Sequence, residues 1–348
     1  MSNRGREYPS ERKFFTDPET GVKITKLTAF PIMHNKLYFH INQFTPDSQT
    51  LVFGCQREPA RAASRDIYKV NIDGMGLFQL TDDPDLSGAI LSFDGKYLFY
   101  MSNGTLKRVD IQSFEEVEIN HIDGLKTADC TSLTYDGKYF CGEADTVDGN
   151  RMLYLFATDG SEKRIICQSD MITHTQIEPS EGRLIAFQHG PDEQHRNIWL
   201  VDIDGSNMRP LELPYGNGHW MWLGDTKRIM TNLESCCWGI STYAEGDASP
   251  EKIVSDGLTC WHGSCSVDGK WMVTDTNWPD QGIHVINVAS KRHAKLCSSN
   301  SSNAHPQWSH PHPSFSPDVR HVVFNSDQTG IAHIYLAEVP EELKENLR

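Results

Sequence analysis

The residues of this chain best suited to chemistry lie in one short stretch near its C-terminus, Gln307-Trp308-Ser309-His310-Pro311-His312. Side chains two residues apart in an extended segment share a face, so His310 and His312 can direct both imidazoles into one cavity. Pro311 and Pro313 fix φ and remove backbone donors, which excludes a helix. Because neutral imidazole is the commonest metal ligand, the stretch indicates a metal site. The alternative is a Pro- and His-rich turn whose imidazoles bond to the backbone.

A turn signature that recurs along the chain predicts the elements that hold these histidines. Its acidic residues stand at positions 47, 94, 136, 181, 225, 268 and 318, at intervals of about 45 residues. Each turn is followed by short apolar runs, and several repeats then have an alternating run that ends in Asp-Gly, a strong hairpin signal. The seven copies are Thr45-Pro46-Asp47, Ser92-Phe93-Asp94-Gly95, Thr134-Tyr135-Asp136-Gly137, Pro179-Ser180-Glu181-Gly182, Leu223-Gly224-Asp225, Ser266-Val267-Asp268-Gly269 and Ser316-Pro317-Asp318.

This period is typical of a β-propeller blade, so the sequence predicts an all-β fold, a seven-bladed β-propeller. The last copy lacks an outer strand, and residues 22–27 have the missing pattern. We therefore expect an N-terminal strand to close the ring by pairing into the last blade, which removes an exposed edge. No composition shift divides the chain, so we expect a single domain over residues 1–348, with an N-terminal extension at 1–21 and blades over 22–340. A pair of β-sandwiches is the alternative, which seven matched turns disfavour.

Histidines occur in the predicted inner strands of five blades, where a propeller lines its central channel. They are His34 and His40 in blade one, His174 in blade four, His219 in blade five, His262 in blade six, and His310 and His312 in blade seven. A channel histidine can simply hold water. Taken together, His262, His310 and His312 with the amide oxygen of Gln307, and without a thiolate, suit a borderline divalent ion. No Gly-x-Ser-x-Gly motif is present, and the length leaves no room for a hydrolase domain, which disfavours a propeller peptidase.

The bulk properties exclude several classes of partner. The chain has 32 basic and 47 acidic residues, a net charge of −15, and no Lys/Arg-rich run, which argues against nucleic acid and anionic membranes as partners. Residues 1–15 lack the apolar core of a signal peptide, and no apolar run approaches the ~18 residues of a membrane span. The nine cysteines form no Cys-x-x-Cys motif, so we expect buried, reduced thiols in a cytoplasmic protein. The oligomeric state is left open.

Several motifs together resemble one known family over residues 38–340. They are Gln307-x-x-His310-Pro311-His312-Pro313-Ser314-Phe315, Phe39-x-x-x-Gln43-Phe44-Thr45-Pro46-Asp47, Gln79-Leu80-Thr81, Phe187-x-His189-Gly190-Pro191 and Trp199-Leu200-Val201. With them the sequence resembles the oligogalacturonate lyases, bacterial polysaccharide lyases built on a seven-bladed propeller. The resemblance implies Mn²⁺, or another divalent cation, held by His262, Gln307, His310 and His312.

The resemblance also implies catalytic and substrate-binding residues. His219 matches the general base of the family, although its neighbours differ. The family has a substrate-binding arginine two residues before Trp199, where this chain has Asn197, and Arg196 stands one residue earlier. Consecutive strand residues face opposite sides, so Arg196 reaches the channel only if a bulge re-aims it. The resemblance thus implies His219 and Arg196 as catalytic residues, and His174, His189 and Asn197 as substrate-binding residues.

The function that the resemblance implies is metal-dependent β-elimination in pectin degradation. A short oligogalacturonide, or a related hexuronate oligosaccharide, would lose its C5 proton to His219 and yield a 4,5-unsaturated uronate. The alternatives are a non-enzymatic propeller that binds a protein or sugar ligand, and a metal-dependent isomerase or hydrolase on the same scaffold.

Overall fold

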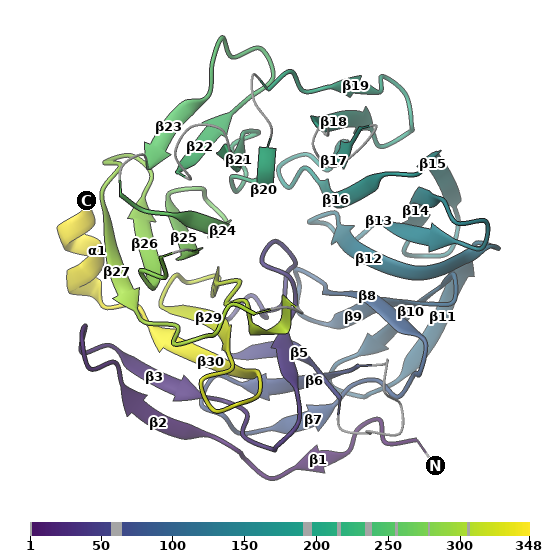
Figure 1. Ribbon diagram of the computed structural model, residues 1–348. Coiled ribbons are helices and arrows are strands. Elements are labelled where there is room, and N and C mark those ends of the chain that lie inside the picture. Colours follow the sequence, from purple (N-terminus) through teal and green to yellow (C-terminus); the bar gives the residue numbers. More distant parts are fainter. Residues whose placement is uncertain are drawn as a thin grey trace.

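Seven antiparallel sheets stand as blades around a common axis (Figure 1). The computed structural model describes residues 2–56, 65–190, 197–213, 217–233, 239–254, 257–277, 279–304 and 307–348. Within each blade, successive strands follow one another from the axis outward. The predicted all-β, seven-bladed propeller is therefore confirmed. None of the helices in these ranges is long and apolar enough to cross a membrane.

Each blade contains four or five strands, which follow in order from the axis outward. Blade one has β4 (His34–Lys36), β5 (Thr50–Cys55), β6 (Asp66–Asn71), β7 (Leu77–Gln79) and β1 (Glu7–Tyr8); blade two has β8 (Leu86–Leu91), β9 (Tyr97–Ser102), β10 (Thr105–Asp110) and β11 (Glu116–His121); blade three has β12 (Leu125–Leu133), β13 (Tyr139–Thr146), β14 (Arg151–Ala157) and β15 (Lys163–Ser169). Blade four has β16 (Ile172–Ile177), β17 (Leu184–His189), β18 (Asn197–Asp202) and β19 (Arg209–Pro210); blade five has β20 (Asn217–Trp222), β21 (Ile229–Leu233), β22 (Ile240–Tyr243) and β23 (Glu251–Val254). Blade six has β24 (Cys260–Cys265), β25 (Trp271–Thr276), β26 (Ile283–Asn287) and β27 (His293–Cys297); blade seven has β28 (Ser314–Phe315), β29 (His321–Ser326), β30 (His333–Glu338), β3 (Lys23–Lys26) and β2 (Lys13–Thr16).

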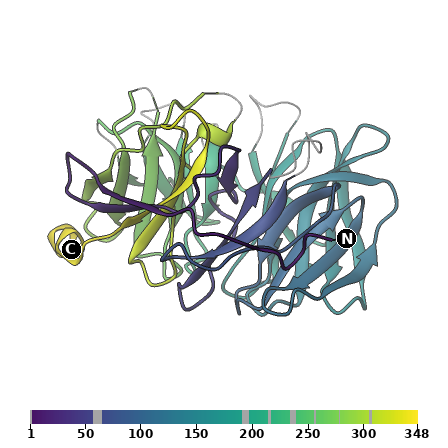
Figure 2. The same cartoon turned by 90° about the horizontal axis from the view of Figure 1, so that it is seen from below.

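The N-terminal segment closes the ring, as the sequence predicted. Strand β3 pairs antiparallel with β30, with Ile24 opposite Ala337. The segment before it adds strands that the sequence did not predict, because β2 pairs with β3 and β1 pairs with β7 of blade one. The three N-terminal strands thus follow the outer rim of blades seven and one, as the side view shows (Figure 2). The chain ends in helix α1 (Glu341–Leu347), which packs against β26 and β27.

The recurring turn signature works through a small hydrogen-bond network. In blade two, the Ser92 hydroxyl donates to the Asp94 carboxylate (2.7 Å), and the backbone N–H of Lys96 donates to the same carboxylate (3.1 Å). The Ser92 oxygen then accepts the N–H of Tyr97 (2.9 Å), which opens strand β9. Blades one, six and seven repeat this arrangement. The Ser/Thr and Asp of the signature therefore set the register between the first two strands of a blade.

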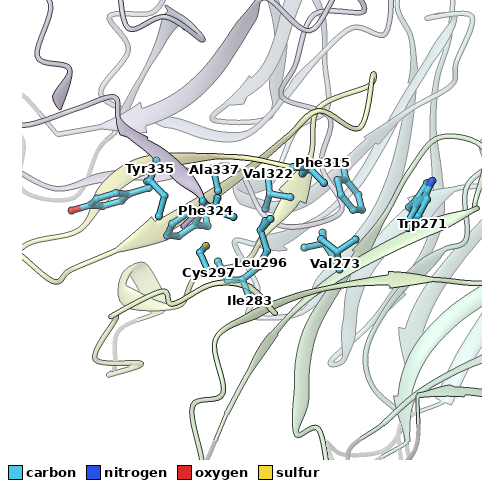
Figure 3. Packing of buried hydrophobic residues seen from close by; sticks show 14 of the residues in the cluster. Trp271, Val273, Ile283, Leu296, Cys297, Phe315, Val322, Phe324, Tyr335 and Ala337 are labelled. Atoms are coloured by element: carbon cyan, nitrogen blue, oxygen red, sulfur yellow. The ribbon is translucent and has the colours of Figure 1, made fainter. Parts of the chain in front are cut away.

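The core consists of seven clusters, one between each pair of neighbouring blades. Figure 3 shows the cluster between blades six and seven, in which Val273 and Ile283 of one sheet meet Val322 and Phe324 of the next. Ile24 of the closing strand belongs to the same cluster. Burial of these apolar faces fixes the angle between blades and holds the inner strands in place around the axis.

Blade one departs from its predicted pattern. The sequence predicts one inner strand over residues 34–43, yet β4 covers only His34–Lys36. Residues 37–43 instead loop into the centre of the ring (Figure 1), where Tyr38 and Phe39 contact histidines of blades four to seven. We call residues 37–43 the axial loop.

Candidate functional site

Three buried histidines from two blades meet beside the axial loop. His262 lies in β24, and His310 and His312 precede β28. One ligand atom from each lies within 4.8 Å of those of the other two. The ring centroids are 4.1 Å apart for His262 and His312, and 5.5 Å apart for His310 and His312. The sequence-predicted histidine set is thus brought together in the structure.

A buried carboxylate orients this cluster. Asp275, in β25, accepts a hydrogen bond from the backbone N–H of His262 (2.7 Å) and another from that of His312 (3.1 Å). The same carboxylate lies 2.9 Å from Nδ1 of His262. With Nδ1 protonated toward Asp275, Nε2 of His262 carries the lone pair that faces the other two rings. Sequence reasoning missed Asp275.

The protonation states fit a metal site. Burial, reinforced by neighbouring imidazoles, lowers the pKa of His262 and of His312 well below the usual value. Burial raises the pKa of Asp275 to about 7, although the two backbone donors oppose this shift. Nε2 of His262 and Nε2 of His312 are buried and have no hydrogen-bond partner within the described part of the chain. Neutral imidazoles with converging, unsatisfied nitrogen atoms match the donor set that binds a borderline divalent cation.

A repeated backbone irregularity positions the histidines of blades four, five and six. The inner strand of each has one extra residue relative to its neighbour, between Thr173 and Gln176, Asn217 and Trp220, and Cys260 and Gly263. His174, His219 and His262 each lie within such a bulge. Because a bulge re-aims a side chain without ending the strand, the same device turns three imidazoles toward the axis.

The predicted base and its neighbour adjoin the three-histidine cluster. The ring of His219 lies 4.3 Å from that of His262 and 5.7 Å from that of His174, between centroids. The Tyr38 hydroxyl of the axial loop lies 3.4 Å from Nε2 of His174. His219 is partly exposed, whereas His262 is fully buried behind it. The arrangement therefore places an accessible imidazole next to the buried ones.

The segment that carries His310 and His312 was predicted to be an extended approach to a strand, and it begins instead with a turn. Gln307–Ser309 form a short 3₁₀ turn, η1, and His310 N–H donates to the Gln307 carbonyl oxygen (3.0 Å). His312 has φ 47°, a left-handed conformation that is strained for a residue with a side chain. The two imidazoles still converge, because this turn replaces the alternation of a strand. The Gln307 side chain is exposed at the cavity wall.

The remaining predicted residues lie apart from this cluster. His189 ends β17, where its Nδ1 lies 2.9 Å from the Met171 carbonyl oxygen and its ring packs edge-on against Trp199. Asn197 opens β18 directly opposite His189. Their roles in substrate binding stay predictions. Arg196 lies outside the described residues.

A cavity of about 670 Å³ opens beside the cluster. His312, Gln307 and Trp308 line it on blade seven, and His174 lines it on blade four. Between them the wall contains three cationic side chains, Lys36, Arg65 and Arg151. Two carboxylates, Asp129 and Asp145, also line it. A protein of net charge −15 therefore has a small excess of positive charge at this cavity, as an anionic ligand would require.

Comparison with known proteins agrees with the site. A family model described as oligogalacturonate lyase matches residues 123–343. The chain belongs to the oligogalacturonate lyase family. The protein is therefore an enzyme of the polysaccharide lyase class, as the sequence motifs predicted, and the non-enzymatic alternative is set aside.

Relatives of the family match over nearly the whole chain. The oligogalacturonate lyase of Dickeya dadantii is 26% identical over 94% of this chain and 96% of that protein. The oligogalacturonide lyase of Pectobacterium atrosepticum is 24% identical over 98% and 99%. A solved oligogalacturonate lyase in complex with manganese has a TM-score of 0.85 at 24% identity, covering 99% of this chain and all of that one. One from Vibrio parahaemolyticus has a TM-score of 0.84 at 24% identity, covering 98% of this chain and all of that one. These likenesses establish the shared propeller fold.

Asp275 and Lys36 are two buried polar residues that sequence reasoning did not single out. The signal for Asp275 is a carboxylate in a strand whose every residue, from Trp271 to Thr276, is buried. Lys36 is buried in β4, and its Nζ donates to the Leu37 carbonyl oxygen (2.7 Å). Burial lowers the pKa of Lys36 well below its usual value, and Asp275 counteracts part of that shift. A buried ionisable side chain in a strand near the axis is a sign of function that a motif does not reveal.

Proposed function

We propose that this lyase cleaves short oligogalacturonides, or related hexuronate oligosaccharides, by metal-dependent β-elimination to a 4,5-unsaturated uronate. The observation that carries the proposal is the convergence of three buried histidines beside a partly exposed fourth, His219. A propeller that only binds a partner has no need of buried imidazoles with unsatisfied nitrogen atoms. The substrate class follows from the family and from the cations of the cavity.

The cation that we propose for the site is Mn²⁺ or another divalent ion. His262, His310 and His312 would hold it, with Gln307 as a fourth ligand from the exposed rim. When bound, such an ion supplies Lewis acidity that stabilises negative charge developing on a carboxylate. The solved relative in complex with manganese supports this choice.

Residues of the chain itself would remove the proton, contact the sugar and orient the metal ligands during the elimination. The C5 proton, α to the carboxylate, must be removed while the C4–O bond breaks. We assign His219 as the general base, since its imidazole is partly exposed and adjoins the metal-site histidines. His174 and Tyr38 border the same space and would contact the sugar ring. Asp275 holds His262 in the tautomer that leaves Nε2 available.

The test is turnover of digalacturonate, followed by absorbance of the unsaturated product, with and without chelator treatment and added Mn²⁺. The His219→Ala variant should lose about 10²- to 10⁴-fold in kcat, the usual contribution of a general base, while its metal content stays that of the wild type. His121→Ala, an exposed histidine on β11, is the matched control and should keep full activity. A His219→Ala enzyme with near-wild-type kcat would show that another group takes the proton.

We also propose that the reaction takes place in the cytoplasm. Seven described cysteines are free, and five of them are buried. Unpaired thiols in the core are typical of proteins from reducing compartments. Fractionation of the native source, with activity measured in each fraction, tests this location.

A further inference from the structure

The three cations of the cavity differ in their partners. Arg151 faces two carboxylates, with its guanidinium 3.2 Å from Asp129 and 3.3 Å from Asp145. Lys36 donates to a backbone carbonyl oxygen and is deeply buried. Arg65 makes no hydrogen bond or ion pair within the described part of the chain. Its contact there is the ring of Trp308, whose centroid lies 3.8 Å from the guanidinium carbon.

Such an arginine is poised for an anion. Burial lowers the pKa of Arg65 only to about 10, so the side chain stays positively charged at neutral pH. Partial burial of a cation without a counter-ion costs free energy, and a bound ligand of opposite charge offsets that cost. Stacking on Trp308 holds the guanidinium plane while leaving its N–H groups free to form a bidentate pair with a carboxylate.

Arg65 lines the same cavity as His312 of the proposed metal site. Trp308 follows Gln307 in the chain, and both line the cavity together with His312 and Arg65. The same wall of blade one also contains Lys36. Elsewhere on the lining, in blade three, Asp129 and Asp145 neutralise Arg151 and leave no excess positive charge. The uncompensated positive charge of the cavity is therefore concentrated on the side of Arg65.

We propose that Arg65, held by Trp308, binds the carboxylate of the uronate next to the reacting one. This inference rests on the proposed function and names a specificity determinant for the same site. In a disaccharide the reacting sugar carries the C5 proton, and its C4–O bond joins it to the leaving sugar. The second carboxylate belongs to that leaving sugar, and Arg65 selects for it. Trp308 is a positioning residue, since it acts through the guanidinium.

The experiment compares digalacturonate with the disaccharide whose leaving unit is a methyl ester. The wild type should have a lower KM for the acid than for the ester. Arg65→Gln should raise KM for the acid roughly tenfold to a hundredfold, the effect of losing a charge-assisted pair, with a smaller change in kcat, and it should erase the preference over the ester. Trp308→Ala should raise KM for the acid, and Trp308→Phe, which keeps a stacking ring, should restore part of the loss.

Controls separate this inference from the proposed function. Arg292→Gln removes one positive charge from an exposed site on blade six, and it should leave both KM values unchanged. Arg65→Lys keeps the positive charge but loses the planar guanidinium that forms a bidentate pair, so its KM should lie between those of the wild type and Arg65→Gln. Digalacturonate binding is also measured by calorimetry in His219→Ala, with and without the Arg65→Gln change, which reports on the subsite without turnover.

The outcomes are distinct. If the wild type is an active lyase and Arg65→Gln has the same KM for digalacturonate as the wild type, the subsite is refuted. The proposed function then still stands. A wild type that binds digalacturonate through Arg65 without forming unsaturated product would support the subsite and refute the β-elimination. Equal calorimetric affinities of His219→Ala with and without the Arg65→Gln change for digalacturonate would also overturn the subsite.

Discussion

Replacement of Asp275 by asparagine should weaken metal binding without unfolding the blade. The two side chains have nearly the same size, but an amide group has only one oxygen that accepts. In the wild type, one carboxylate oxygen accepts the N–H of His262, and the other faces Nδ1 of His262 and the N–H of His312. In the more favourable orientation of the amide, its oxygen takes the place of the carboxylate oxygen that faces Nδ1 of His262 and the N–H of His312. The NH₂ group then points toward the backbone N–H of His262. Two donors then face each other.

The size of the effect follows from these contacts. One buried donor without an acceptor costs about 1–3 kcal/mol of folding stability. Loss of a carboxylate that orients a ligating histidine costs about 10- to 100-fold in metal affinity. That factor corresponds to about 1.4–2.7 kcal/mol of binding free energy. Asp275→Asn should therefore remain folded with a lower Tm and bind Mn²⁺ more weakly by that factor.

The assay is competition for Mn²⁺ against a chelator of known affinity, with Tm recorded on the same samples. Asp268→Asn is the matched control, because Asp268 accepts hydrogen bonds in the turn of the same blade and lies away from the histidines. It should lower Tm and leave Mn²⁺ affinity unchanged. If Asp275→Asn binds Mn²⁺ within twofold of the wild type, the carboxylate supports the blade and does not orient His262.

Two further predictions concern stability. Acidification from pH 7 to pH 4 should destabilise the fold. Burial lowers the pKa of His284 and of His333 to about 4 in the folded protein. In the unfolded chain these histidines have a pKa near 6.5, so the unfolded chain binds protons at a higher pH than the folded protein does. The slope is up to about 1.4 kcal/mol per pH unit for each histidine, measured by urea unfolding; a His333→Gln variant with an equally steep slope would contradict the assignment. Ile24→Ala, in the closing strand, should cost about 2–5 kcal/mol, measured by the same unfolding, whereas the exposed Lys23→Ala should change little; equal losses would argue against the packing role of Ile24.

The fold was accessible from sequence because its determinants are local. The Ser/Thr and Asp of each turn form their network within six residues, as Ser92, Asp94 and Tyr97 show, so the repeat is visible as a motif. The closing strand was accessible for the same reason, because residues 22–27 carry the apolar alternation that the last blade lacks. Strand β1 was not, since its partner β7 lies in a distant part of the chain. Strand β2 pairs with its sequence neighbour β3, but that hairpin is held in the ring only through the pairing of β3 with the distant β30.

The site was only partly accessible. The histidines stood out by type and by their place before each turn, yet their aim depends on bulges that the sequence does not reveal. The segment Tyr38-Phe39-His40-Ile41 has the aromatic and β-branched residues typical of a strand, but contacts with His174 and His312 keep it in the axial loop. Asp275 carried no signal by itself, because its role exists only where β24 and β25 bring it opposite the bulge that contains His262.

The axial loop has a consequence for the order of events during synthesis. It belongs to the first blade to leave the ribosome, whereas His312, which it contacts together with His219 and His262, belongs to the last. No partial chain can assemble the cluster, since the strand that seals the ring is N-terminal and its partner β30 is nearly the last to be made. The proposed metal ligands therefore stay incomplete through most of translation, and we expect metal to bind only once the ring has closed.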